Sequence, residues 1–96
     1  MTNIYRVPQP KFPLGELYVT AAVDKTLAPE DIQTALVRHA LGDWGDLNTE
    51  DRDRNESALC EAGGFHSVYH DRNGVTFWII TEADRSVTTV LLPDDY

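Results

Sequence analysis

The sequence predicts a single α+β domain with the element order β-α-α-β-β-β, in which an antiparallel sheet packs against helices. Three observations support this fold class. Residues 65–96 contain three short apolar runs separated by turn-forming segments, a pattern typical of a three-stranded antiparallel meander. Two helical patterns, over about residues 28–41 and 48–61, precede this meander, and a run of strand-forming residues precedes both helices. The chain has 96 residues, which is enough for one hydrophobic core.

The beginning of the chain divides into an arm and a strand. Residues 1–14 include three prolines, which lack the N–H group that a regular hydrogen-bond ladder needs, so we expect an extended arm that is ordered only in part. The domain is expected to span residues 15–96. Its first strand is predicted at residues 15–23, which are rich in strand-forming residues and lie between Gly15 and Asp24.

The first helical pattern has a clear beginning and a clear end. Pro29 stands where a first helical residue belongs, and Glu30 and Asp31 follow in the first turn, where carboxylates interact favourably with the helix dipole. The residues predicted to face the core are Ile32, Ala35, Leu36, His39 and Ala40, with Val37 and Leu41 widening the stripe. Gly42 then indicates the helix end.

The second helical pattern is more polar than the first. Asn48 or Thr49 can cap its free backbone donors, and the pattern continues to about Glu61, before two glycines. Because its apolar stripe is thin, we expect a surface helix with little buried area. Cys60, the single cysteine of the chain, excludes an intramolecular disulfide and is assigned to packing.

The meander is predicted to turn through Asn73-Gly74, a dipeptide typical of the two-residue turn that matches the twist of a hairpin. This turn would pair Phe77 with His70 and Trp78 with Tyr69. One predicted face then carries Phe65, Tyr69, Trp78, Ile80, Val87, Thr89 and Leu91, and the other carries His66, Val68, His70, Phe77, Ile79, Thr88, Val90 and Leu92. Both faces would therefore expose large apolar groups to a neighbouring layer.

The first helix can cover one of these faces, but the second helix is too polar to cover the other. Either the proline-containing arm or a second copy of the chain would have to cover it, because large exposed apolar patches usually mark an interface. The sequence thus predicts a homodimer as one possible assembly. Its predicted interface consists of Tyr69, Trp78, Ile80 and Val87.

The charge of the chain restricts its partners. Eight Lys and Arg residues stand against sixteen Asp and Glu residues, which gives a formal net charge of −8. This charge opposes the phosphate backbone, so direct nucleic-acid binding is not expected. The charge has two interpretations: it keeps the chain soluble, which is the favoured one, or it forms a surface that competes with nucleic acid for a basic protein partner. No apolar stretch approaches the roughly 20 residues that span a bilayer, and the start of the chain lacks a secretory signal pattern. We expect a cytoplasmic protein without membrane contact.

The segment between the helices, residues 39–48, has two interpretations. In the functional one, His39, Asp43, Asp46 and Asp51 bind a divalent cation, because carboxylates suit Mg²⁺ or Mn²⁺ and an imidazole adds a nitrogen ligand. In the structural one, Trp44 is an anchor between helices and His39 packs on the inner face of its helix. The structural interpretation is favoured, because the spacing matches no known metal-binding loop. Accordingly, no metal, cofactor or catalytic residue is predicted.

Three motifs carry a resemblance to a known family. They are His39-x-x-Gly-Asp-Trp-Gly-Asp-Leu, Glu50-Asp51-x-x-x-Asn55 and Thr81-Glu-Ala-Asp-Arg-Ser-Val-Thr-Thr-Val-Leu-Leu-Pro93 continuing to Tyr96. With these motifs, residues 12–96 resemble a family of short bacterial proteins found on plasmids, phages and integrated elements. The resemblance brings no activity or catalytic residues with it. It implies a setting in which small acidic proteins often act against host defence, such as CRISPR interference or restriction.

The sequence therefore favours a protein-binding module over an enzyme. Its predicted partner-binding residues, together with the flanking Asp94 and Asp95, are Asp43, Trp44, Asp46, Glu50, Asp51, Asp53 and Glu56. Such a surface would dock on a basic patch of a larger complex, with charge raising the association rate and aromatic anchors supplying affinity. Two alternatives stay open: a small metal-dependent enzyme that uses the four residues named above, and a structural accessory protein without an inhibitory role.

Overall fold

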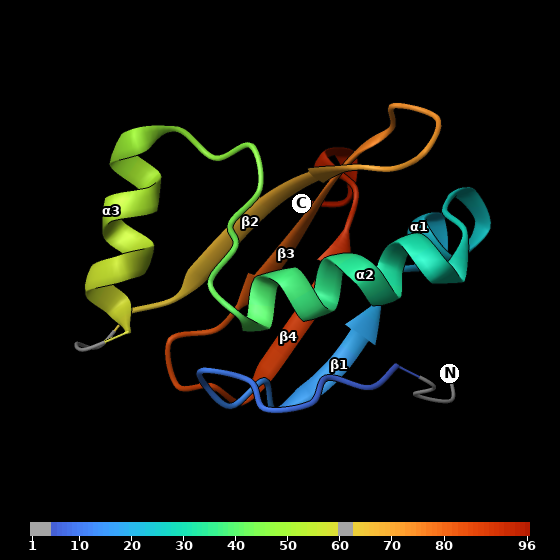
Figure 1. The fold of residues 1–96 in the computed structure, drawn as a ribbon. Helices are drawn as coiled ribbons and strands as arrows, with labels where there is room; N and C mark the ends of the chain where they lie inside the picture. Colours follow the sequence, from blue (N-terminus) through green and yellow to red (C-terminus); the bar gives the residue numbers. More distant parts are fainter. Residues whose placement is uncertain (1–4, 60–62) are drawn as a thin grey trace.

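The computed structural model describes residues 5–59 and 63–96 and has an α+β architecture (Figure 1), which confirms the predicted α+β class. The predicted order β-α-α-β-β-β is wrong in one respect, because an additional short helix follows the first strand. The elements are β1 (Glu16–Val19), α1 (Ala21–Thr26), α2 (Pro29–Ala40), α3 (Thr49–Ala58), β2 (Phe65–His70), β3 (Thr76–Thr81), β4 (Val87–Leu91) and the short 3-10 helix η1 (Pro93–Asp95). In Figure 1, α1 and α2 lie on the same side of the sheet, and α3 stands apart beside β2. No helix in the described part of the chain is long and apolar enough to cross a membrane.

The sheet is mixed, with the strand order β1-β4-β3-β2. The meander β2-β3-β4 is antiparallel as predicted, but β1 runs parallel to β4, so the prediction of a wholly antiparallel sheet is wrong. The hairpin signals determine only the pairing of β2, β3 and β4. The neighbour and the direction of β1 depend on where the two following helices carry the chain, which no local sequence signal specifies.

The predicted first strand is too long, because its second half forms a helix. β1 ends at Val19, and the Thr20 side chain accepts a hydrogen bond from the Val23 backbone N–H at 3.2 Å. This contact caps α1, and two alanines follow the cap, which suits a helix better than a strand. Val23 is fully buried and belongs to the main core cluster.

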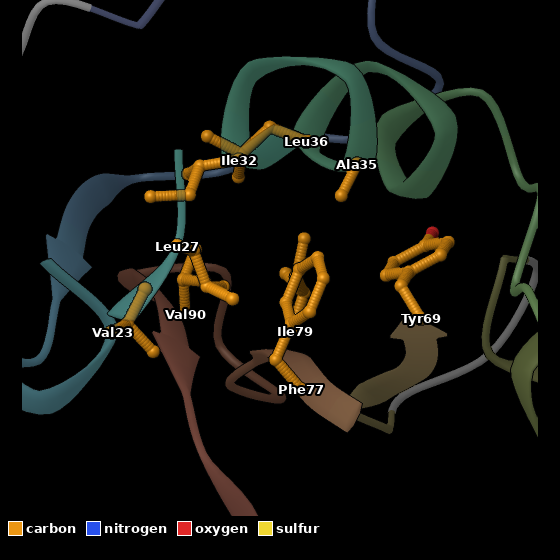
Figure 2. Packing of buried hydrophobic residues seen from close by; sticks show 9 residues of the cluster. All are labelled: Val23, Leu27, Ile32, Ala35, Leu36, Tyr69, Phe77, Ile79 and Val90. Atoms are coloured by element: carbon orange, nitrogen blue, oxygen red, sulfur yellow. The ribbon is translucent and has the colours of Figure 1, made fainter. Parts of the chain in front are cut away.

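Helix α2 begins at Pro29, and its predicted inner face is confirmed. All five residues of the predicted stripe, Ile32, Ala35, Leu36, His39 and Ala40, are buried. Figure 2 shows Ile32, Ala35 and Leu36 on the helix above Val90, Ile79, Phe77 and Tyr69 of the sheet. Leu41 is the exception, because 45% of its surface is exposed, so it does not widen the stripe.

The turn between β2 and β3 differs by one residue from the prediction. Gly74 has a positive φ of 81°, while the Asp71 carboxylate accepts hydrogen bonds from the backbone of Asn73 and Val75, each at 2.8 Å. A three-residue loop closed by a glycine results, instead of the two-residue turn. The register therefore pairs Tyr69 with Phe77, which places Tyr69 on the buried face. The predicted grouping of Tyr69 with Trp78 is wrong, since a slip of one residue exchanges the faces of a whole strand.

The pairing of β3 with β4 keeps the predicted faces. Trp78 lies opposite Leu91 and Ile79 opposite Val90, so alternate residues of both strands share the faces that the sequence assigned to them. Only in β2 are the two faces reversed relative to the prediction. The buried face thus consists of Phe65, Ser67 and Tyr69 from β2 with Phe77, Ile79, Thr81, Thr88 and Val90 from the other two strands.

The described part of the proline-containing arm packs against the domain. Phe12 is buried and stacks on Phe65, with ring centroids 4.1 Å apart, and the backbone N–H of Lys11 donates to the Ala40 carbonyl at 2.8 Å. Leu14 is also part of the core. An aromatic and an aliphatic side chain thus anchor the arm to the core, and the expectation that the arm as a whole is ordered only in part stays a prediction. The arm covers the same face of the sheet as α2.

Helix α3 lies on the surface, as its polar sequence predicts, and one buried side chain ties it to the sheet. The Asn55 amide donates to the His66 carbonyl at 2.7 Å and accepts from the His66 N–H at 3.2 Å. Asn48 caps the helix by accepting from the Asp51 N–H at 2.9 Å. The helix ends at Ala58, and the predicted continuation to Glu61, like the assignment of Cys60 to packing, lies outside the described residues.

Replacing Asn55 with alanine should lower the free energy of unfolding by about 2–3 kcal/mol, because two backbone groups of β2 lose their partner. Urea unfolding followed by circular dichroism measures this change. Arg54→Ala on the same helix is the control, since its exposed ion pair with Asp51 contributes less than about 1 kcal/mol. Equal losses in the two variants would contradict the role assigned to Asn55.

Candidate functional site

His39 lies at the centre of a buried chain of polar groups. Its Nδ1 atom is 2.6 Å from the Ser67 hydroxyl and its Nε2 atom is 2.9 Å from the Thr81 hydroxyl. Thr81 in turn lies 2.7 Å from the Thr88 hydroxyl, which donates to the Leu14 carbonyl. The chain of contacts therefore connects α2 with all three strands of the meander and with the arm.

The hydroxyl groups determine which nitrogen of His39 carries the proton. The single proton of Thr88 goes to the carbonyl of Leu14, so the Thr81 hydroxyl must donate to Thr88. Thr81 then accepts from His39, which places the imidazole proton on Nε2 and leaves Nδ1 to accept from Ser67. Every donor in this chain has an acceptor only while the imidazole is neutral. Consistently, burial lowers the pKa of His39 to about 3, with a smaller contribution from the charge of His66.

The metal-site alternative does not fit this arrangement. Both ring nitrogens of His39 are engaged in the core, whereas the Asp43 carboxylate binds Arg38 and the Asp46 carboxylate binds His70 at 2.6 Å. Asp51 lies on α3 and pairs with Arg54. Among residues 5–59 and 63–96 there is no group of three or more His, Cys, Asp or Glu side chains that could hold a metal ion. The four residues are close in sequence but are not brought together in space.

The acidic flank of the molecule consists of Asp43, Asp46, Glu50, Asp51, Asp53 and Glu56. Part of its charge is balanced locally. Arg38 donates to both oxygens of Asp43, at 2.8 and 3.1 Å, and this contact lowers the pKa of the carboxyl group. Glu50 and Asp53 are exposed and line a surface pocket of about 440 Å³ beside α3. Whether these carboxylates contact a partner stays a prediction.

Trp44, the predicted aromatic anchor of this flank, is not at the surface. Only 2% of its surface is exposed, and its ring stacks on Phe65 with centroids 5.3 Å apart. Its indole N–H donates to the Glu56 carboxylate at 2.7 Å, so one oxygen of Glu56 takes part in a hydrogen bond within the fold. The structural interpretation of Trp44 is therefore supported, and its inclusion among the partner-binding side chains is corrected.

Tyr69 has a comparable structural role. It is 2% exposed, its hydroxyl donates to the backbone carbonyl of Asp43, and Arg38 lies 4.8 Å above its ring. Burial raises the pKa of its phenol. Of the four residues predicted for a dimer interface, Tyr69 thus belongs to the core, whereas Trp78, Ile80 and Val87 share the opposite face of the sheet.

This opposite face, called the open face below, is formed by the outward positions of the four strands. They are Glu16, Tyr18, His66, Val68, His70, Thr76, Trp78, Ile80, Val87, Thr89 and Leu91, of which Leu91 is buried and Trp78 and Ile80 are partly buried. None of these positions is Lys or Arg. Tyr18 is 52% exposed, and Tyr96, 86% exposed, meets the Trp78 ring edge-on at 5.9 Å. Sequence reasoning did not place either tyrosine here, although the alternation in β1 points to Tyr18.

Two contacts on the open face involve polar side chains. The Tyr18 hydroxyl donates to the Glu16 carboxylate at 2.6 Å, so a phenol and a carboxylate lie together on β1. His66 meets the Trp78 ring edge-on at 4.8 Å, and burial lowers the pKa of its imidazole. The face therefore combines aromatic and aliphatic surface with one carboxylate, that of Glu16. Such a combination can bind cationic side chains.

Comparisons of the chain with protein-family models, curated proteins and solved structures found no match.

Proposed function

We propose that this chain is a protein-binding module that docks its open face on a basic surface of a larger partner and acts by stoichiometric binding. One observation carries the proposal. Tyr18, Trp78 and Ile80 lie on a sheet face whose strand positions contain no Lys or Arg, in a chain with a formal net charge of −8. Trp and Tyr side chains often contribute most of the binding energy at protein interfaces. A protein that binds in this way needs no catalytic group.

In this proposal the charge of the chain affects the association rate, and its apolar surface affects the dissociation rate. The negative field of the whole chain raises the rate at which a basic partner is met, and the exposed carboxylates Glu50 and Asp53 of the acidic flank contribute to it. Trp78 and its neighbours supply the contact area that slows dissociation. Binding should therefore weaken as salt rises, mainly through a slower association.

The resemblance to proteins of mobile elements suggests what the partner is. Complexes that carry out CRISPR interference or restriction hold nucleic acid in positively charged channels, and an acidic module competes for such a surface. We therefore propose inhibition of a host defence complex, in the cytoplasm, as the specific form of the binding function. The proposal involves no metal, cofactor or catalytic residue.

A second copy of the chain is the alternative occupant of the open face, with Trp78, Ile80 and Val87 in the interface. Light scattering after size exclusion measures the mass of the protein in solution, and at low and high salt it distinguishes a monomer from a dimer. A mass of one chain leaves the face free for a partner. A mass of two chains at both salts assigns the face to a dimer and moves the docking of the partner to the acidic flank.

Trp78→Ala is expected to weaken inhibition at least tenfold, because it removes the largest side chain of the open face. The assay titrates purified CRISPR interference complexes and restriction endonucleases with the chain and measures DNA cleavage. The expected endpoint lies near one chain per partner. Leu41→Ala is the matched control, because it removes an exposed apolar side chain from α2, and it should change inhibition less than twofold.

Besides a dimer that occupies the open face, two results would contradict the proposal. One is the lack of both binding and inhibition across the panel at low salt. The other is inhibition that survives Trp78→Ala while the circular dichroism spectrum shows that the variant is folded.

A further inference from the structure

The two edges of the sheet differ in how their backbone groups are used. At β2, the Val68 N–H donates to the Trp44 carbonyl at 3.2 Å, and the Val68 carbonyl accepts from the Asp46 N–H at 2.8 Å. The next outward residue, His66, has its N–H and its carbonyl bonded to Asn55. The β2 edge is therefore closed by the chain itself, which is one way in which proteins protect an edge strand.

The other edge, β1, has a different arrangement. The Glu16 N–H donates to the Ser86 carbonyl at 2.9 Å and the Thr20 N–H to the Val90 carbonyl at 3.1 Å, so the even-numbered residues turn their backbone toward β4. Since successive residues of a strand point their backbone groups to opposite sides, Leu17 and Val19 turn theirs away from the sheet. Within residues 5–59 and 63–96, no hydrogen bond joins these groups to another segment. In Figure 1, β1 lies at the end of the sheet opposite to β2.

We infer that β1 is the docking edge at which an extended basic segment of the partner adds to the sheet as a fifth strand. This inference rests on the proposed function and specifies where and how the partner binds. The backbone groups of Leu17 and Val19 provide four hydrogen-bonding sites for such a segment, two donors and two acceptors. The strand is short, so backbone pairing alone gives weak binding and the side chains must add affinity.

The side chains beside the edge select the chemistry of the segment. Glu16 and Tyr18 project on the open face, and residues opposite them in a neighbouring strand lie about 5 Å away. A Lys or Arg at that position meets the carboxylate of Glu16 and the ring of Tyr18 together. Leu17 and Val19 face the core side and are partly buried, so the alternate positions of the segment favour apolar residues. The expected segment thus alternates basic and apolar side chains.

The test uses a synthetic peptide of alternating Lys and Val, with blocked ends, added to the intact protein. Amide hydrogen exchange followed by nuclear magnetic resonance reports on single residues. In the free protein, the amides of Leu17 and Val19 should exchange fast, and saturating peptide should slow them at least tenfold. The amide of Tyr18, which faces β4, should change less than threefold.

Two peptide controls separate strand addition from attraction between opposite charges. One carries N-methyl groups on all Val residues and the other on all Lys residues, with the net charge unchanged. A strand turns only alternate N–H groups toward its neighbour, so one of the two peptides should lose protection of Leu17 and Val19 and the other should keep it. Equal behaviour of both peptides would overturn the inference.

A pair of protein variants provides the matched control for charge. Glu16→Gln keeps the acceptor for Tyr18 and removes one negative charge at the edge, and it should weaken peptide binding three- to tenfold. Glu50→Gln removes the same charge from α3 and should weaken it less than twofold. Equal effects of the two variants would mean that only the overall charge attracts the peptide, which also overturns the inference.

Hydrogen exchange in the free protein, without peptide, is a further test of the inference. If Leu17 and Val19 are already protected without peptide, the edge is occupied, and protection that rises with protein concentration identifies a second copy as the occupant. Either result overturns strand addition by a partner. The two proposals fail separately. If Trp78→Ala abolishes inhibition while the edge tests fail, the open face binds the partner and only the inference about β1 is overturned. If a folded Trp78→Ala variant still inhibits, the proposed function itself fails.

Discussion

Replacing Gly45 with alanine should lower the free energy of unfolding by about 3–5 kcal/mol, which would leave little folded protein in a domain of ordinary stability. Gly45 has a φ of 72°, a conformation that strains any side chain. A Cβ atom there would lie 2.0 Å from the Val68 carbonyl oxygen and 2.8 Å from the ring of Tyr69. The carbonyl cannot move away without breaking its hydrogen bond to the Asp46 N–H.

Comparison with Gly74→Ala separates the two causes of the Gly45 effect, which are the steric overlap of the added Cβ atom and the strain of the backbone. Gly74 has a similar φ of 81°, but an added Cβ atom would meet nothing within 4 Å. This variant should therefore lose only the strain, about 1–2 kcal/mol. Urea midpoints or thermal unfolding measure both variants, and each kcal/mol corresponds to a shift of about 4–8 °C in Tm for a domain of this size. If the two variants were equally stable, the close packing of the loop against β2 would not be important for stability.

Helices α2 and α3 could be predicted from the sequence because their signals are local, whereas α1 was predicted as part of a strand. Pro29 with two acidic residues marks the start of α2, and Asn48 marks the start of α3. The faces of β2 could not be predicted, because Asn73-Gly74 is compatible with a two-residue turn and with a three-residue loop. The deciding contact is the Asp71 carboxylate, which bonds to two backbone N–H groups and favours the longer loop. A difference of one residue there moved Tyr69 from the open face to the core.

The candidate site was predicted less well than the fold. The acidic residues near Trp44 suggested one surface, but the glycines on both sides of Trp44 allow the chain to bring the indole inside. The partners of His39 come from strands that are distant in sequence. Thr81 and Thr88 lie opposite each other in the β3–β4 pair, a relation that becomes visible only when the register is known. The place of Tyr18 on the open face depends likewise on the position of β1 beside β4.

The protein should lose stability as the pH falls below about 6.5, and His39 should be the main cause between pH 6.5 and 4.5. Its folded pKa of about 3 lies below the ordinary value of 6.5, so the folded state binds fewer protons than the unfolded state in this window. The stability that the neutral imidazole provides is therefore present above pH 6.5 and is lost as the pH falls toward 3. Between pH 7.5 and 5.0 the expected loss is about 2 kcal/mol.

Other groups are less important in this window. Burial also lowers the pKa of His66, so this side chain contributes in the same direction. The pKa of Asp43 is lowered mainly by its hydrogen bonds to Arg38, and its contribution is lost only below its ordinary value of 3.8. A loss of stability that begins near pH 6.5 thus points to the histidines, and variants can separate them.

His39→Gln is the decisive variant, because glutamine can accept from Ser67 and donate to Thr81 but does not titrate. Urea unfolding at pH 7.5 and 5.0 should show a loss of about 2 kcal/mol or more in the wild type and a much smaller loss in this variant. Leu41→Ala, a change at an exposed side chain that does not titrate, should keep the slope of the wild type. The ring resonances of His39 provide a test without any substitution: they should stay unchanged from pH 7.5 down to about 4.5. A His39 ring that titrates near pH 6.5 in the folded protein would contradict both its burial and the chain of hydroxyl groups that fixes its tautomer.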